Sequence, residues 1–266
     1  MYLRHHRSSW VALFIFGVLI FAMALAYGPA FFSSKNEKPV GHKNAQVPLA
    51  GDFTLAVSWQ PAFCETRPKL VECRTQGKGR FDAANFALHG LWPEPPSNIY
   101  CDVSAQMENT DRRRIWRALP QLGLSRQTRA ALKIVMPGYA SYLHRHEWIK
   151  HGTCSNGNAQ AYYAASLALM EILNETPARD LFASNIGEAL SATQIRTAFD
   201  QAFGEGAGDR VEAVCVNDGS RRLISELRIA LSGKIEIEPD MGILINQAST
   251  KRRGCRAGTV DAVELQ

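Results

Sequence analysis

The sequence predicts an α+β fold in which a central antiparallel sheet packs against several helices. Strand patterns lie at the front of the folded part and again at its end, and helical patterns lie between them. Of the 266 residues, 46% are hydrophobic and 21% are charged, which excludes a disordered chain. A mean hydropathy of -0.17 also excludes a polytopic membrane protein.

The first strand is predicted at 53–59. Phe53, Leu55, Val57 and Trp59 alternate there with Thr, Ala and Ser. A period of two is typical of a strand, so a strand is expected before any helix of the folded part.

Helices are predicted in the middle of the chain. Apolar residues at helical spacing define three segments. These segments are 111–119, 125–135 and 159–173. A fourth helix is expected to end at Phe203, because Ser191 and Gln194 match a capping box at its start and Gly204 lies where a helix stop is expected.

The pattern returns to strands near the end of the chain. Residues 211–216, 224–231 and 235–237 alternate or carry β-branched side chains. Gly219 and Gly233 lie between these segments and indicate turns. Strands at both ends of the folded part therefore predict the antiparallel sheet.

The N-terminus is predicted to direct export. Positive charge at 4–7 precedes an almost wholly apolar stretch, 10–26. Residues 1–34 are interpreted either as a signal peptide with a small-x-small cleavage site at 24–26, or as a single-pass anchor with 10–32 in the membrane. A buried core helix is a third interpretation. Both leading interpretations place the remainder in the periplasm or outside the cell.

Export favours disulfide bonds in the rest of the chain. Residues 35–51 are rich in Lys, Asn, Pro and Gly and are predicted to be a linker, which leaves 52–266 as the folded domain. All the cysteines lie in that domain and no C-x-x-C pair occurs, which argues against a cysteine zinc site. The six are Cys64, Cys73, Cys101, Cys154, Cys215 and Cys255.

Two short segments of the domain, 86–94 and 146–154, concentrate histidines beside Glu, Lys and Trp. A zinc hydrolase would need two histidines four residues apart on one helical face. His146 and His151 are five apart, so on a helix their rings would diverge by about 140°. The neighbouring Lys150 would also oppose a cation. His144 is expected to be a loop or surface residue.

The same residues suit acid–base cleavage of RNA. One group must take the 2'-hydroxyl proton and another must protonate the leaving 5'-oxygen, and two histidines do both near neutral pH. His146 and Lys150 are candidates to face the charge on the phosphate. Glu147 is a candidate to orient a histidine. Trp92 and Trp148 offer surfaces on which nucleobases stack.

The two segments resemble the active-site signatures of the ribonuclease T2 family. The resemblance rests on His-Gly-Leu-Trp-Pro at 89–93 and on the segment 146–154, in the family's order. It extends to Ser-Trp-Gln-Pro at 58–61, to Val-Met-Pro-Gly at 135–138 and to the cysteine layout. It identifies 52–266 as a ribonuclease catalytic domain.

The resemblance implies a role for each catalytic candidate. His151 is expected to be the general base and His89 the general acid. His146 is expected to bind the phosphate, and Glu147 with Lys150 to stabilise the transition state. The implied reaction is transesterification of single-stranded RNA to a 2',3'-cyclic phosphate and then hydrolysis to a 3'-phosphate, with no metal and no cofactor.

The resemblance also implies a base pocket and a disulfide pattern. Trp92 and Tyr100 are expected in the pocket, and Trp148 is expected either there or in the core. The implied disulfides are Cys64–Cys73, Cys101–Cys154 and Cys215–Cys255. The chain is expected to be a monomer. Two other functions are considered: a catalytically weak RNA-binding or cytotoxic relative, and the zinc hydrolase.

Overall fold

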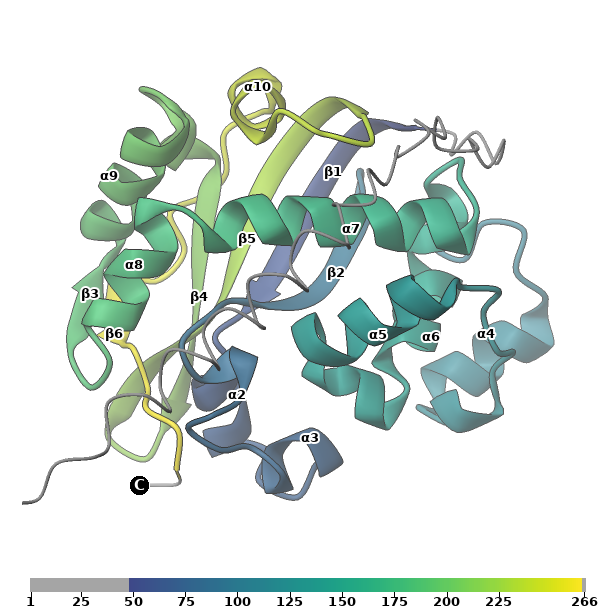
Figure 1. The fold of residues 1–266 in the computed structure, drawn as a ribbon, viewed down its shortest axis with the longest axis horizontal. Coiled ribbons are helices and arrows are strands. Elements are labelled where there is room, and N and C mark those ends of the chain that lie inside the picture. The colour runs from purple at the N-terminus through teal and green to yellow at the C-terminus, as the bar shows by residue number, and fades with distance from the viewer. Residues whose placement is uncertain (1–47, 265–266) are drawn as a thin grey trace, which may run out of the picture. The chain divides into compact units, whose positions relative to one another are not determined.

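The structure, a computed structural model, describes residues 48–264 (Figure 1). The predicted signal peptide or anchor at 1–34 and nearly all of the predicted linker lie outside the described residues. Among residues 48–264, no helix has the length and hydropathy that a membrane span requires.

A six-stranded sheet forms the centre of the domain, in the order β2–β1–β5–β6–β3 with β4 paired to β5. The strand pairs are antiparallel apart from a short parallel contact between β5 and β6. This confirms the predicted α+β class with its antiparallel sheet. The strands are β1 (Leu49–Ser58), β2 (Ala87–Pro93), β3 (Ala189–Ser191), β4 (Val211–Asp218), β5 (Arg221–Ile235) and β6 (Ala257–Thr259).

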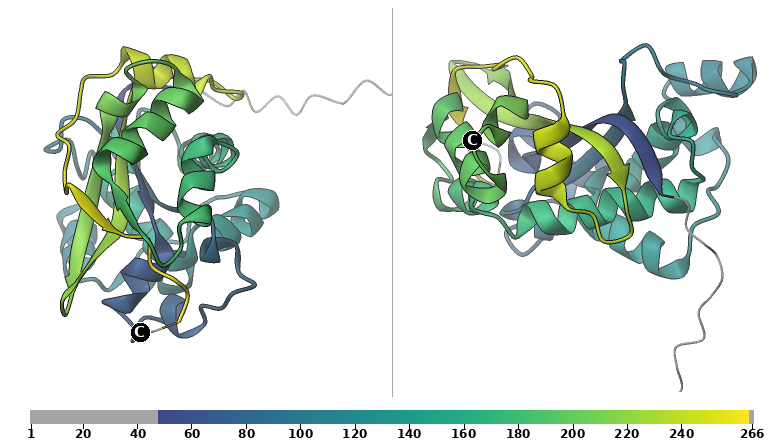
Figure 2. Two further views of the ribbon diagram at one scale, coloured as in Figure 1. Left: turned by 90° about the vertical axis from the view of Figure 1, so that its left-hand side faces the viewer. Right: turned by 90° about the horizontal axis from the view of Figure 1, so that it is seen from above.

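Helix α7 runs across the strands on one face of the sheet (Figures 1 and 2). Helices α4, α5 and α6 lie beyond β2, the strand at one edge of the sheet (Figure 1). The helices are α2 (Gln60–Glu65), α3 (Val71–Arg74), α4 (Ala105–Arg112), α5 (Arg126–Val135), α6 (Leu143–Lys150), α7 (Ala159–Asn174), α8 (Pro177–Ser184), α9 (Ala192–Phe203) and α10 (Met241–Gln247).

The core joins α7 and α8 to the sheet. Trp59, Phe86 and Phe182 pack their rings edge-on or tilted, with centroids 4.8–5.9 Å apart. Tyr162 of α7 bonds to β2 through its hydroxyl, which accepts from the Leu91 amide at 3.1 Å and donates to the Leu91 carbonyl at 2.8 Å. The Leu91 amide and carbonyl, which point away from β1 at the edge of the sheet, are thus satisfied from within the molecule.

Most predicted helices agree with the structure. Helix α5 begins after the Ser125 cap and α7 spans nearly the predicted segment. The capping box of α9 is present, and Gly204 ends that helix with a φ of +97°. The prediction of a helix at 111–119 was wrong. The chain enters α4 earlier, because Ser104 caps it, and Arg114 adopts a left-handed φ of +59° that ends the helical path.

The structure also corrects the strands. Strand β5 runs unbroken through Gly233, which was predicted to be a turn. Gly233 pairs with Gly51 of β1, and both adopt positive φ, so the ladder bends there without breaking. Strand β1 begins at Leu49, inside the predicted linker 35–51, because Leu49 is buried and pairs with Ile235.

Three disulfides join the pairs that the family resemblance implies. Cys64–Cys73 closes α2 onto α3, and Cys215–Cys255 ties β4 to the segment before β6. Cys101–Cys154 ties the loop after β2 to the turn after α6. The last bond therefore connects the two segments that carry the sequence signatures.

The Cys101–Cys154 disulfide is predicted to contribute more to the free energy of unfolding than the Cys64–Cys73 disulfide. Replacing both members of a bond by Ser should lower the free energy of unfolding by about 4 kcal/mol for the 53-residue separation and by about 2.6 kcal/mol for the 9-residue one. Urea unfolding of both double variants measures this. Equal losses in the two variants would contradict the loop-length argument.

Candidate active site

A β-bulge sets the position of His89 on β2. Ala56 of β1 pairs with Gly90 and Val57 pairs with Leu88, so His89 is the extra residue between them. Bulges re-aim the side chains that they carry and are frequent beside active sites. The His89 side chain remains 33% exposed although its neighbours in the strand are largely buried.

Helix α6 supplies the second group of site residues. His146, Glu147 and Lys150 share one face at spacings of one, three and four residues, and His151 is the C-cap. The helix begins after its N-cap Tyr142, whose φ of +67° turns the chain out of the preceding 3₁₀ turn. Sequence reasoning had placed the candidate residues but had not predicted this helix.

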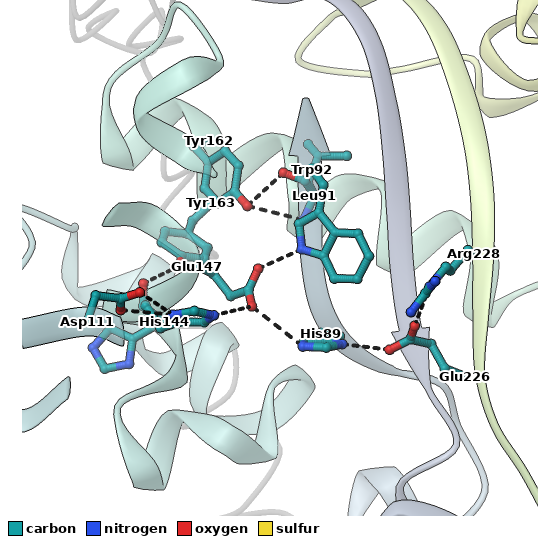
Figure 3. Close-up of polar contacts among 11 residues, drawn as sticks. His89, Leu91, Trp92, Asp111, His144, Glu147, Tyr162, Tyr163, Glu226 and Arg228 are labelled. Atoms are coloured by element: carbon teal, nitrogen blue, oxygen red, sulfur yellow. Dashed lines mark hydrogen bonds and ion pairs between the residues drawn. The ribbon is translucent and has the colours of Figure 1, made fainter. Parts of the chain in front are cut away.

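Glu147 lies at the centre of the site (Figure 3). Its side chain is 1% exposed, and its Oε2 accepts a hydrogen bond from Trp92 Nε1 at 2.8 Å. Its Oε1 lies 3.5 Å from His89 Nε2 and 3.7 Å from His146 Nε2. One buried carboxylate therefore faces both imidazoles. Gly90 makes this approach possible, because a Cβ there would collide with Oε2.

His89 is held between carboxylates from two sides. Its Nδ1 lies 2.6 Å from Glu226 Oε2, and Arg228 donates from Nε to Glu226 Oε1 at 2.7 Å. Burial by itself would lower the pKa of His89. The hydrogen bond to Glu226 and the charges of Glu147 and Glu226 outweigh burial and the repulsion from Arg228, so the pKa is raised above 6.5.

His146 has a carboxylate partner of its own. Its Nδ1 lies 2.8 and 2.9 Å from the two carboxylate oxygens of Asp111, which is 1% exposed. Tyr100 donates its hydroxyl to Asp111 at 2.8 Å. The ring of Trp116 stacks on His146 with centroids 4.6 Å apart. These contacts hold the imidazole with its Nε2 toward Glu147.

His151 has the opposite surroundings. It is 8% exposed, stacks on Trp92 with centroids 5.3 Å apart, and its Nδ1 has no hydrogen-bond partner among residues 48–264. Burial lowers its pKa to about 2, and the positive charges of Lys150, His146 and His89 act in the same direction. His151 is therefore a neutral imidazole near physiological pH.

The remaining predicted residues lie in or beside this cluster. The Tyr100 amide donates to the Lys150 carbonyl at 2.9 Å, which joins the loop after β2 to the end of α6. Trp148 meets Tyr162 edge-on and packs against Gly152, whose Cβ would collide with the indole. These contacts favour the core interpretation of Trp148 over the stacking platform.

His144 differs from its expected surface position. It is 5% exposed and stacks on Tyr139 with centroids 3.8 Å apart, and burial lowers its pKa to about 4. Tyr163 donates its hydroxyl to the His144 carbonyl. His144 thus packs α6 against its neighbours and takes no part in the cluster.

Sequence reasoning missed the residues behind the histidines. Glu226 and Arg228 are charged residues two apart within a mostly apolar predicted strand, and that spacing was the available signal. Asp111 is the first residue of the predicted helix 111–119, and Trp116 lies within that segment. Nothing local in the sequence relates Asp111 to His146. Among residues 48–264, no three His, Cys, Asp or Glu side chains gather as metal ligands.

Comparisons with known proteins identify the family. The model of the Ribonuclease T2 family matches residues 50–244. Ribonuclease I of Escherichia coli (strain K12) is 30% identical over 234 residues, covering 79% of this chain and 85% of that protein. Extracellular ribonuclease LE of Solanum lycopersicum is 28% identical over 161 residues, covering 57% of this chain and 64% of that protein.

The fold agrees with a solved structure, the crystal structure of RNase NT in complex with 5'-AMP. The TM-score is 0.52 at 18% identity, and the alignment covers 80% of this chain and 98% of that chain. The family model and the named relatives define the class of this protein, a ribonuclease. The chain belongs to the Ribonuclease T2 family and is a metal-independent endoribonuclease.

Gly90→Ala is predicted to disable the site without unfolding the domain. The added methyl would displace Glu147 and the Trp92 indole, and a displacement of about 1 Å costs about 10²-fold in rate. RNA cleavage by the folded variant measures this loss. Gly77→Ala is the matched control, because its Cβ meets nothing within 4 Å. Equal rates for the two variants would contradict the close packing of Glu147.

Proposed function

We propose that the chain is an exported endoribonuclease that cleaves single-stranded RNA through proton transfers by His151 and His89. The observation that carries this proposal is the contrast between the two rings. Both belong to one cluster around Glu147, yet His89 faces carboxylates and His151 faces cations. The pair therefore holds an acid and a base at the same pH.

His151 is the proposed general base. A base must be unprotonated before it accepts the 2'-hydroxyl proton, and the lowered pKa of His151 keeps its imidazole neutral. The freed 2'-oxygen attacks the phosphorus, and the bond from phosphorus to the 5'-oxygen breaks. The product is a 2',3'-cyclic phosphate.

His89 is the proposed general acid. Its raised pKa keeps the ring protonated, and its Nε2 gives that proton to the leaving 5'-oxygen. In the second step a water molecule attacks the cyclic phosphate. The two histidines then exchange roles: His89 takes a proton from the water, the bond from phosphorus to the 2'-oxygen breaks, and His151 returns its proton to that oxygen. A 3'-phosphate is released.

His146 and Lys150 are the proposed partners of the phosphate. Negative charge accumulates on the phosphate oxygens in the transition state, where fixed cations and donors stabilise it. Asp111 holds Nδ1 of His146 and turns Nε2 toward Glu147 and the centre of the site. Glu147 holds both imidazoles through its Oε1 and is the proposed anchor of this arrangement.

Trp92 and Tyr100 are the proposed base-pocket residues. The Trp92 ring lies between His151 and Arg228, so a base bound against its edge lies next to the general base. The Tyr100 ring faces the Arg112 guanidinium, whose carbon lies 4.8 Å from the ring centroid. We further propose a monomer.

Residues 52–266 are the proposed catalytic domain. We propose that this domain is exported and that residues 1–34 direct the export. The apolar run at 10–26 and the three disulfides support it, because disulfides persist in oxidising compartments. The tomato relative is named an extracellular ribonuclease. Mass spectrometry of the mature N-terminus separates a cleaved signal from a retained anchor.

His151→Ala and His89→Ala are each predicted to lower the rate of RNA cleavage by about 10² or more, because each removes a proton-transfer partner. Cleavage of RNA in EDTA, with detection of the cyclic phosphate, measures the loss. His144→Ala controls for removal of a buried histidine outside the cluster. Near-normal rates in folded variants would refute the roles, and RNA binding without products in the unmodified protein would support the catalytically weak alternative.

A wide plateau is predicted in the pH dependence of kcat/KM. The acid limb follows protonation of His151 and should lie far below 6.5, because that pKa is lowered to about 2. The alkaline limb follows deprotonation of His89 and should lie above 6.5, because that pKa is raised. Initial rates on a dinucleotide substrate check both limbs. An acid limb near 6.5 would contradict the assignment of His151.

A further inference from the structure

Glu226 reaches His89 across an intervening strand. It belongs to β5, whereas His89 belongs to β2, and β1 lies between them. Its carboxylate is 11% exposed, and Oε2 lies 2.6 Å from His89 Nδ1. Figure 3 shows the glutamate beside the imidazole, on the side opposite Glu147.

The sheet makes this reach possible. Ser58 of β1 pairs with Glu226 on one side and with Ala87 on the other, and Ala56 likewise separates Arg228 from Gly90. Small side chains on β1 leave room above the strand for the glutamate. A second bulge, at the residue before Glu226, shifts the register of β5 against β4. A bulge therefore lies at His89 on β2, and another lies next to Glu226 on β5.

The contact also sets the tautomer of the histidine. A buried carboxylate paired with Arg228 only accepts hydrogen bonds, so Nδ1 of His89 must be the donor. The mobile proton then resides on Nε2, the nitrogen that faces Glu147 and the centre of the site. The general acid proposed above needs its proton on that nitrogen.

We propose that Glu226 is a positioning residue that orients His89 and maintains its protonated form, and that Arg228 opposes it by limiting the negative charge that His89 meets. The proposal rests on the proposed role of His89 as the general acid. It assigns the Glu226–Arg228 pair to catalysis, whereas an ordinary ion pair of the sheet would serve only stability.

The charges around His89 make the effect of each residue distinct. Glu226 and Arg228 face it from β5, Glu147 faces it from α6, and His151 follows that helix. Glu226 and Glu147 raise the pKa of His89, whereas Arg228 lowers it. Neutralising Glu226 and neutralising Arg228 must therefore move the titration of His89 in opposite directions.

The test compares Glu226→Gln with Arg228→Gln. Each amide keeps the approximate shape of the side chain and removes its charge. In Glu226→Gln, we expect the alkaline limb of kcat/KM to move to lower pH and kcat at the optimum to fall by about 10- to 100-fold. In Arg228→Gln, the limb should move to higher pH. Glu236→Gln is the control, because it removes the same charge from the exposed pair with Lys234.

A second measurement keeps the result independent of activity. The NMR titration of His89 in each folded variant should show its pKa lowered in Glu226→Gln, raised in Arg228→Gln and unchanged in Glu236→Gln. An unchanged titration in Glu226→Gln, or shifts of the same sign in the first two variants, would overturn the proposal. Failure of the general-acid role is seen separately, as near-normal cleavage by His89→Ala.

Discussion

The rest of the site depends on the burial of one charge. A carboxylate that is 1% exposed costs several kcal/mol unless hydrogen bonds and opposite charges compensate it. Glu147 obtains that compensation from Trp92 and from the two imidazoles at its Oε1. Its position therefore requires α6 to dock closely on β2, and Gly90 is the residue that allows the distance.

The docking of α6 on β2 gives His89 and His151 different charged neighbours. The His89 ring gains carboxylates from α6 and from β5, whereas His151 lies among cations with little access to water. The pKa of His89 is therefore raised from the ordinary value of 6.5, whereas the pKa of His151 is lowered from it. A pair of titrating groups separated in this way is how an active site keeps an acid and a base together.

Much of this architecture was predictable from the sequence, because local patterns carry it. Alternation revealed β1 and β4, helical spacing revealed α5 and α7, and the capping box revealed α9. The signatures named the catalytic candidates and implied the disulfide pairs. Features that depend on other elements were missed. The left-handed Arg114 shortens a helix, and the paired glycines Gly51 and Gly233 let β5 continue through an expected turn.

The carboxylate partners of His146 and His89 could not be predicted from local sequence patterns. Asp111 reaches His146 across 35 residues of sequence, and Glu226 reaches His89 across 137. Each partner is placed by an element that carries no signature. The loop before α4 is tied to the end of α6 by Cys101–Cys154, and β5 is held by the ladder with β1. The signature residues carry the proposed chemistry, and the orientation of their rings comes from the tertiary fold.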